Sequence, residues 1–148
     1  MYTGILDLHN LVRWLVLLAA AAALVNAYAG LFGRRAFTRR DRTLGTVFTS
    51  AMDLQFLIGL ILYLVSPLVQ SALGDMSAAM QDPTRRFFAV EHASIMLLAV
   101  VLAHVGSVLA RRAASDRGKF QQQAIWFSLS TLAVLFAIPW WRPLLPGL

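Results

Sequence analysis

Apolar residues form four long runs along the chain, and polar segments rich in arginine separate them. The runs cover residues 6–30, 44–69, 87–110 and 124–141. Each run is long enough for a helix that crosses the hydrocarbon core of a bilayer, which takes roughly 20 residues at about 1.5 Å per residue. The pattern therefore predicts an all-α integral membrane protein, folded as an antiparallel four-helix bundle.

The segments between the runs are too short to form a separate soluble domain. These connections cover residues 31–43, 70–86 and 111–123. We therefore expect residues 1–148 to form a single transmembrane domain. Within the second connection, the dipeptide Asp82-Pro83 is typical of a helix start and predicts a short amphipathic helix on the membrane surface.

Basic residues concentrate in the first and third connections. Nine of the 13 lysines and arginines lie there, namely Arg34, Arg35, Arg39, Arg40, Arg42, Arg111, Arg112, Arg117 and Lys119. An even number of spans separates these connections, so both lie on one side of the membrane, and the positive-inside rule assigns that side to the cytoplasm. We predict an N-out, C-out topology in a bacterial cytoplasmic (inner) membrane. The net charge of +6 is then explained by contact with the lipid bilayer and does not indicate binding of nucleic acid.

Composition narrows the possible chemistry. Hydrophobic residues make up 59% of the chain, in agreement with a membrane protein, and cysteine is absent. The absence of cysteine excludes disulfides, iron–sulfur clusters, thiolate ligation of haem and covalent c-type haem attachment. The sequence also lacks a glycine-rich phosphate loop.

Ionisable residues inside the runs are the candidate functional residues, since each costs roughly 2.5–3.5 kcal/mol at a helix centre. Toward the predicted outer face lie Asp7, His9, Arg13, Glu91 and His92. The first and third runs point in the same direction, so His9 and His92 lie at similar depths. Two imidazoles on neighbouring helices suit the axial positions of a haem b iron, and Arg13 then balances a haem propionate or pairs with Glu91. The alternative is that both histidines are interfacial residues hydrogen-bonded to loop backbone.

A second polar group lies toward the predicted inner face, with one residue on each run. Its members are Asn26, Asp53, His104 and Ser128. Asp53 and His104 lie about 12 Å and about 9 Å from the inner ends of their runs, so we expect that they can meet. His104 lies about 18 Å along the axis and roughly 120° around it from His92, which does not favour a second bis-histidine haem stacked below the first. We interpret the Asp53–His104 pair as a link between helices, a proton-transfer element or part of a quinone site; His104 also allows a second haem whose other ligand is water or absent.

Short motifs distributed over nearly the whole chain carry a family resemblance. They are Met1-Tyr2-Thr3-Gly4, Leu8-His9, Arg13-Trp14, Leu54-Gln55, Ile58-Gly59-Leu60-Ile61-Leu62-Tyr63, Ser66-Pro67, Val90-Glu91-His92 and Ala137-Ile138-Pro139-Trp140. Together they resemble short four-helix bacterial membrane proteins usually labelled cytochrome b. The resemblance implies a haem-binding electron-transfer role, with His9 and His92 as the metal ligands. It also implies a histidine before Leu54, where this chain has Asp53, and a carboxylate is a poor axial ligand for low-spin haem b.

Two classes of function remain open. The first is a haem b electron carrier, with one haem expected, that passes electrons between a quinol pool or a membrane dehydrogenase and an outer-face acceptor. The second is a non-catalytic subunit of a larger membrane complex, in which the polar residues only fix helix register. A weaker third hypothesis is a small transporter or proton pathway through Asn26, Asp53 and His104. In the first two cases we expect an electron carrier or a subunit within an oligomer or complex, and not a stand-alone enzyme.

Overall fold

Four long helices make up most of the molecule. The structure is a computed structural model, and it describes residues 1–142. The four long helices are α1 (Tyr2–Gly33), α2 (Arg39–Val65), α6 (His92–Arg112) and α7 (Asp116–Ala137). Three short helices connect α2 to α6: α3 (Pro67–Gly74), α4 (Met76–Gln81) and α5 (Pro83–Arg86). Within residues 1–142 there is no β-strand, which confirms the all-α prediction.

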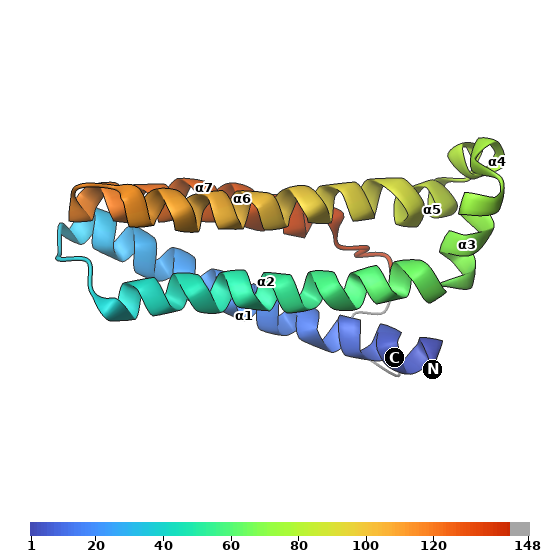
Figure 1. Ribbon diagram of the computed structural model, residues 1–148, viewed down its shortest axis with the longest axis horizontal. Coiled ribbons are helices and arrows are strands. Elements are labelled where there is room, and N and C mark those ends of the chain that lie inside the picture. Colours follow the sequence, from blue (N-terminus) through green and yellow to red (C-terminus); the bar gives the residue numbers. More distant parts are fainter. Residues whose placement is uncertain (143–148) are drawn as a thin grey trace.

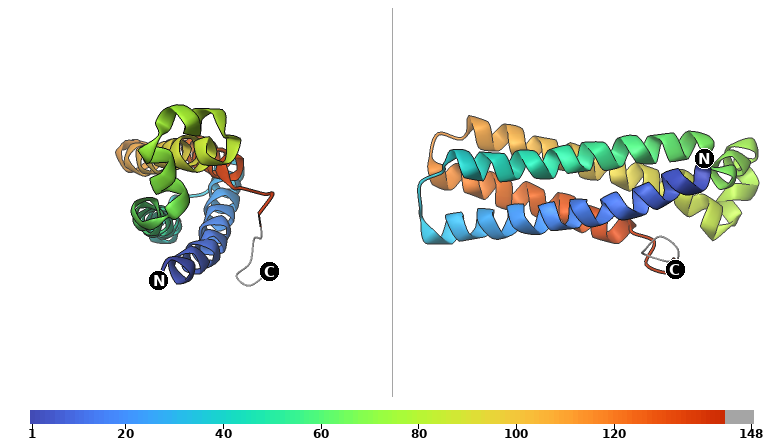
Figure 2. Two further views of the ribbon diagram at one scale, coloured as in Figure 1. Left: turned by 90° about the vertical axis from the view of Figure 1, so that its right-hand side faces the viewer. Right: turned by 90° about the horizontal axis from the view of Figure 1, so that it is seen from below.

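The long helices lie side by side along the long axis of the molecule (Figure 1). Helix α1 packs against α2 and α7, and α6 packs against the same two helices. Figure 2 shows that the short helices close one end, which we call the capped end, and that the N-terminus lies there as well. At the opposite end, which we call the basic end, α1 and α6 end and α2 and α7 begin.

Three helical stretches are long and apolar enough to cross a membrane: Tyr2–Gly33, Arg39–Val65 and Pro83–Arg112. The third stretch joins α5 to α6 through a π-helical turn, η1 (Phe87–Glu91). Helix α7 is not among them, although the sequence predicts a fourth span over residues 124–141. Its first two turns carry Asp116, Arg117, Lys119 and three glutamines, and the helix already ends at Ala137.

The second predicted run, residues 44–69, is not one continuous helix. Helix α2 ends at Val65, and Ser66 has an extended backbone, with φ −72° and ψ 121°. The following residue, Pro67, has no N–H and disfavours the helical conformation in the residue before it, so the chain breaks there. The Ser66 side chain then accepts a hydrogen bond from Val69 N and caps α3.

The connection at the capped end contains more helix than its single predicted start signal indicates. Asp82 caps α5 by accepting hydrogen bonds from the backbone N–H groups of Thr84 and Arg85, as the Asp82-Pro83 signal predicts. Helices α3 and α4 precede it, and the Asp75 side chain caps α4 in the same way through Ala78 N. The segment between α2 and α6 is therefore a folded cap and not a loop.

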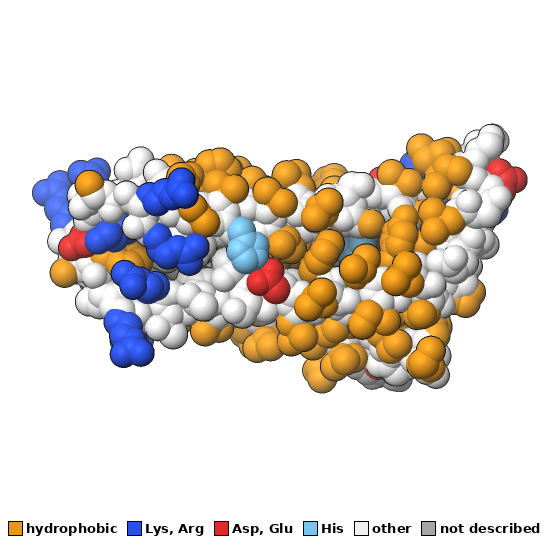
Figure 3. All heavy atoms as spheres, in the orientation of Figure 1, with side chains coloured by type: hydrophobic (Ala, Val, Ile, Leu, Met, Phe, Trp, Pro, Cys, Tyr) orange, Lys and Arg blue, Asp and Glu red, His pale blue; other side chains and the backbone are white. Residues whose placement is uncertain are grey.

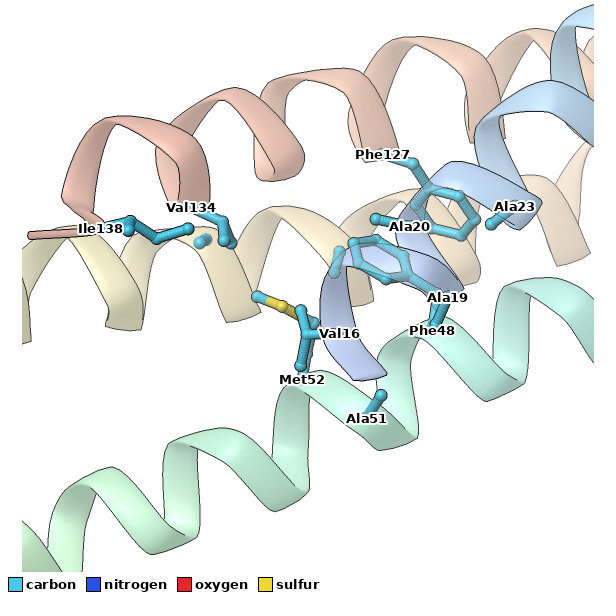
Figure 4. Close-up of a cluster of buried hydrophobic side chains, with 12 residues drawn as sticks. Val16, Ala19, Ala20, Ala23, Phe48, Ala51, Met52, Phe127, Val134 and Ile138 are labelled. Atoms are coloured by element: carbon cyan, nitrogen blue, oxygen red, sulfur yellow. The ribbon is translucent and has the colours of Figure 1, made fainter. Parts of the chain in front are cut away.

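Small residues allow the long helices to approach closely in the centre of the molecule (Figure 4). Ala19, Ala23, Ala99 and Ala103 are all buried, and Phe48 and Phe127 fill the space between them, with ring centroids 5.1 Å apart. Close backbone approach and dispersion contacts are what drive helix association in lipid, where burial of apolar surface gives no net gain between helices. This core fixes the relative positions of the four helices.

Candidate functional site

His9 and His92 meet near the capped end. His9 lies two turns into α1, and His92 is the first residue of α6. Their ring centroids are 6.3 Å apart and their planes cross at 68°. Both side chains are half-buried. The two residues that the sequence expects at similar depth are thus neighbours in space, although 83 positions separate them in the chain.

A hydrogen bond to the backbone fixes the His92 ring. Its Nδ1 lies 2.8 Å from the carbonyl oxygen of Ala137 on α7. A carbonyl oxygen only accepts hydrogen bonds, so Nδ1 carries the proton and, in the neutral ring, Nε2 keeps the lone pair. A ring nitrogen held by a backbone carbonyl is the usual arrangement behind a metal-ligating histidine, because it sets the tautomer and the ring orientation.

The His9 ring lies against α2 and has an unsatisfied nitrogen. A Cβ placed on Gly59 would be 3.2 Å from Cε1 of His9, closer than ordinary van der Waals contact. Gln55, one turn earlier on α2, donates from Nε2 to the His9 carbonyl oxygen at 3.0 Å. Among the described residues, His9 Nδ1 and Gln55 Oε1 are both buried without a hydrogen-bond partner. Since an unpaired buried polar atom is costly, this corner of the site is suited to a further group that supplies polar contacts.

Aromatic side chains surround His92 on the capped side. The ring centroids of Phe87 and Phe88 lie 5.8 Å and 6.2 Å from that of His92, and Trp141 packs on Phe87 at 4.7 Å. Phe87 and Phe88 belong to the π-helical turn, in which the His92 N–H bonds to the Phe87 carbonyl oxygen. A π-helical turn contains one residue more than a turn of α-helix, so it rotates the side chains that follow it about the helix axis. Such turns are frequent at functional sites.

The charged neighbours of the histidine pair have other contacts. The Glu91 carboxylate pairs with Arg86, with 2.7 Å between Oε1 and Nε, so it does not depend on Arg13 for its counter-charge. Arg13 itself is buried, with an exposed fraction of 7%, and its guanidinium lies over the Trp14 ring at 5.8 Å. Asp7 is exposed. Arg13 therefore remains the buried cation one turn along α1 from His9.

Asp53 and His104 also meet, as the sequence expects. Asp53 Oδ1 and His104 Nε2 are 2.7 Å apart across α2 and α6. This pair is far more accessible than the histidine pair, with 45% and 47% of the two side chains exposed. On α6 the apolar side chains of Val100, Val101 and Val105 line a shallow groove beside His104.

The other two members of the predicted inner group do not join this pair. Asn26 accepts a hydrogen bond from Arg35 Nη2 through Oδ1, at 2.7 Å. Ser128 shares a hydrogen bond of 2.9 Å with the hydroxyl of Tyr28. The predicted inner group is therefore divided among three separate contacts, of which Asp53–His104 and Ser128–Tyr28 join two helices and Asn26–Arg35 joins α1 to the loop after it.

Sequence reasoning missed one buried ionic cluster at the basic end. Asp41 is fully buried, and it accepts from Arg35 Nη2 at 2.7 Å and from the Thr38 hydroxyl at 2.7 Å. The hydrogen bond that Arg35 donates to Asp41 raises the pKa of Arg35. The available signal was the spacing Thr38-x-x-Asp41, a capping box that starts α2. Because it ties the loop to the first turn of α2, this cluster is structural.

Comparisons with known proteins give no match: no family model, no curated protein and no solved structure is similar to this chain. Within residues 1–142 there is also no group of three or more histidine, aspartate and glutamate side chains placed to hold a metal ion. Axial coordination of haem iron requires only two ligands. A pair of histidines can supply that number of ligands.

Proposed function

We propose that the protein is a membrane haem b electron-transfer protein in which His9 and His92 are the axial ligands. The observation that carries this proposal is the 6.3 Å separation of the two ring centroids. Imidazole nitrogens bind a first-row metal at about 2.0–2.1 Å, so two rings on opposite sides of one metal have centroids about 6 Å apart. The separation of the two imidazole rings agrees with that requirement.

The residues around the pair fit the proposed group. Hydrogen bonding of His92 Nδ1 to the Ala137 carbonyl leaves Nε2 as the coordinating atom. Gly59 leaves the space that the His9 ring occupies. Arg13 supplies a buried positive charge for a haem propionate, and the phenylalanines of the π-helical turn limit access of water from the capped end. When bound, haem b supplies reversible one-electron chemistry; the chain contributes ligands, a fixed ring orientation and a low-dielectric surrounding.

The distribution of charge supports the proposed orientation. The nine basic residues of the first and third connections lie at the basic end, opposite the histidine pair. We propose that α7 also crosses the membrane, although it is less apolar than the other three long helices; the positive-inside rule then places the basic end in the cytoplasm and both termini outside. The histidine pair then lies near the outer face of a bacterial inner membrane, where the chain passes electrons to a membrane or outer-face redox partner.

A quinol contact at the Asp53–His104 pair is a second candidate function. It is favoured by the combination of a half-exposed hydrogen-bonding pair with an apolar groove on the same helix. A quinone has a polar headgroup and an apolar tail, and this combination offers a contact for each. In that case Asp53 or His104 accepts the proton of a quinol hydroxyl. A proton pathway uses the same two residues but needs no quinone.

The test is a reduced-minus-oxidised visible spectrum of the detergent-purified protein from haem-replete cells, together with a pyridine haemochrome assay. We expect a sharp b-type band at about one haem per chain. His92→Ala should abolish it, and His9→Ala should abolish it or leave a high-spin remnant. His104→Ala is the matched control, since it removes a histidine that lies about 18 Å along α6 from His92.

Each of the other outcomes identifies a different function. A colourless wild-type protein excludes the cytochrome proposal and leaves a structural subunit or a transporter. Low-spin spectra that are unchanged in both His9→Ala and His92→Ala exclude these residues as ligands. About two haems per chain, with one lost in His104→Ala, would add a second haem near the basic end. Loss of proton flux in Asp53→Asn would favour the proton pathway.

A further inference from the structure

A groove runs along α2 from the basic end, and Thr38 is the one lining residue that it shares with the sites described above. It is lined by α2, by the loop that precedes α2 and by Leu15 of α1, with a volume of about 700 Å³. Arg39 and Arg42 line the end of the groove next to the loop, and Val47 and Leu54 line the part that lies further along α2. The groove therefore changes from cationic to apolar along its length.

The spacing of the lining residues makes this a continuous stripe. Positions 39, 42, 47 and 54 recur on one side of α2, together with small and hydroxyl residues between them. The side chains of Leu15, Val47 and Leu54 are each about half exposed, at 50%, 47% and 46%. From Arg42 to Leu54 the stripe extends about 18 Å along the helix, slightly more than half of the roughly 30 Å hydrocarbon core. The stripe as a whole, from Arg42 to Leu54, thus corresponds in length to about one leaflet.

The two guanidinium groups have no counter-charge among the residues that the structure describes. Among the ion pairs of residues 1–142, none involves Arg39 or Arg42. The nearest carboxylate in sequence, Asp41, is fully buried and paired with Arg35. The N-terminus of α2 adds the partial positive charge of its helix dipole at the same place. Figure 3 shows lysine and arginine side chains gathered at this end of the face that it displays, while apolar side chains cover much of the rest.

We propose that this groove is a binding site for an anionic phospholipid. The lipid phosphate lies against Arg39 and Arg42, and one acyl chain lies along Leu15, Val47 and Leu54. Basic pockets at the membrane surface bind anionic headgroups, and each nearby lysine or arginine strengthens the attraction. A free phosphate ion would leave the apolar length of the groove unused, so the continuous change from cationic to apolar favours a lipid. This inference does not depend on the presence of haem.

Lipid binding to the full-length protein, measured by native mass spectrometry, tests the proposal. Phosphatidylglycerol and phosphatidylcholine with the same acyl chains are added to the protein in a neutral detergent. We expect wild type to bind phosphatidylglycerol roughly 10- to 30-fold more tightly than phosphatidylcholine, because the choline cation of phosphatidylcholine offsets the attraction of its phosphate to the two arginines. The double variant Arg39→Gln/Arg42→Gln should lose this preference.

The control variant is Arg111→Gln/Arg112→Gln. It removes the same charge from the same end of the molecule, but neither residue lines the groove. It should keep most of the preference for phosphatidylglycerol. An equal loss in both double variants would overturn the proposal in favour of diffuse attraction to the basic end. Circular dichroism confirms that both variants remain helical.

Two further measurements separate a lipid from other ligands. Glycerol 3-phosphate carries the phosphate without acyl chains and should compete poorly; competition at concentrations equal to those of the lipid would show a soluble phosphate site instead. Val47→Ser shortens the apolar wall without a change of charge and should weaken the binding of both lipids several-fold. Unchanged lipid affinity in this variant would contradict an acyl chain in the groove.

Discussion

The carboxylate of Asp53 and the imidazole of His104 meet across α2 and α6, with 2.7 Å between Oδ1 and Nε2. Fifty-one positions separate the two residues in sequence, so the contact joins the first half of the chain to the second. Both side chains are half-exposed on helices long and apolar enough to span a membrane. In lipid there is no water to replace either partner, and each residue therefore satisfies the other.

Replacement of either member of this pair should destabilise the protein more than replacement of both. Asp53→Leu leaves His104 without its partner, and His104→Leu leaves Asp53 without its partner, whereas the double variant removes both polar groups. We expect a coupling free energy of about 0.6–2 kcal/mol from the double-mutant cycle, the range found for hydrogen bonds between membrane helices. Unfolding in mixed micelles of sodium dodecyl sulfate measures it. A coupling close to zero would show that the contact does not contribute to stability.

Gly59→Ala should disturb the histidine pair. The added methyl group would lie 3.2 Å from His9 Cε1, so the ring must move by a few tenths of an ångström or the helices must separate slightly. If His9 ligates haem, we expect a broadened or partly high-spin spectrum and a lowered haem content. Gly4→Ala is the control, since a Cβ at that position meets no atom within 4 Å. A normal spectrum in Gly59→Ala with reduced haem content in Gly4→Ala would contradict the assigned role of Gly59.

Gly106→Ala should separate α6 from α7. A Cβ on Gly106 would lie 2.6 Å from Cβ of Trp126, an atom next to the backbone that cannot rotate away. Overpacking of this kind costs about 1–3 kcal/mol, and we expect a lower thermal midpoint in detergent. Gly33→Ala provides the comparison, because a Cβ there meets nothing within 4 Å. Equal midpoints for Gly106→Ala and wild type would mean that the two helices can move apart without cost.

The cap of α5 should weaken in acid. Hydrogen bonding from the Arg85 backbone N–H, followed by the Arg85 side chain, holds the pKa of Asp82 below its usual range. A depressed folded-state pKa contributes stability above the unfolded value of about 4, and this contribution is lost as the pH falls through the folded value. Hydrogen-exchange protection at Thr84 and Arg85, normalised for intrinsic rates, should therefore fall below about pH 4.

The matched variant for this pH effect is Asp82→Asn. An asparagine side chain still offers an oxygen to the N–H groups of α5 but carries no titratable charge. Protection at Thr84 and Arg85 should then be lower near neutral pH and nearly independent of acid. A wild-type acid transition that persists in Asp82→Asn would assign it to a different carboxylate.

Local sequence predicts the elements of this fold well where one signal dominates. The length and apolar character of the first three runs predict α1, α2 and α6, and Asp82-Pro83 predicts the start of α5. The spacing from helix ends predicts that Asp53 and His104 can meet, because both distances follow from a rise of about 1.5 Å per residue. The same rule places His9 and His92 at one depth. These features depend on neighbouring residues or on axial position alone.

Other features depend on what lies across the helix interface. The sequence does not show that Ser128 on α7 bonds to Tyr28 on α1, or that the Ala137 carbonyl oxygen on α7 accepts from His92 on α6. The rotation of each helix about its axis decides these contacts, and packing against several neighbours sets that rotation.

The sequence by itself determined that the chain is helical, where its long apolar helices lie and at which depth each polar residue enters them. Periodicity and helical rise are local properties, and they need no partner. Only the tertiary structure decided that the His9 and His92 rings lie 6.3 Å apart, that Ala137 orients His92 and that Arg39 and Arg42 border an apolar groove. These relationships arise where side chains from different helices share one space, and their distances follow from the packing of small residues at the centre of the molecule.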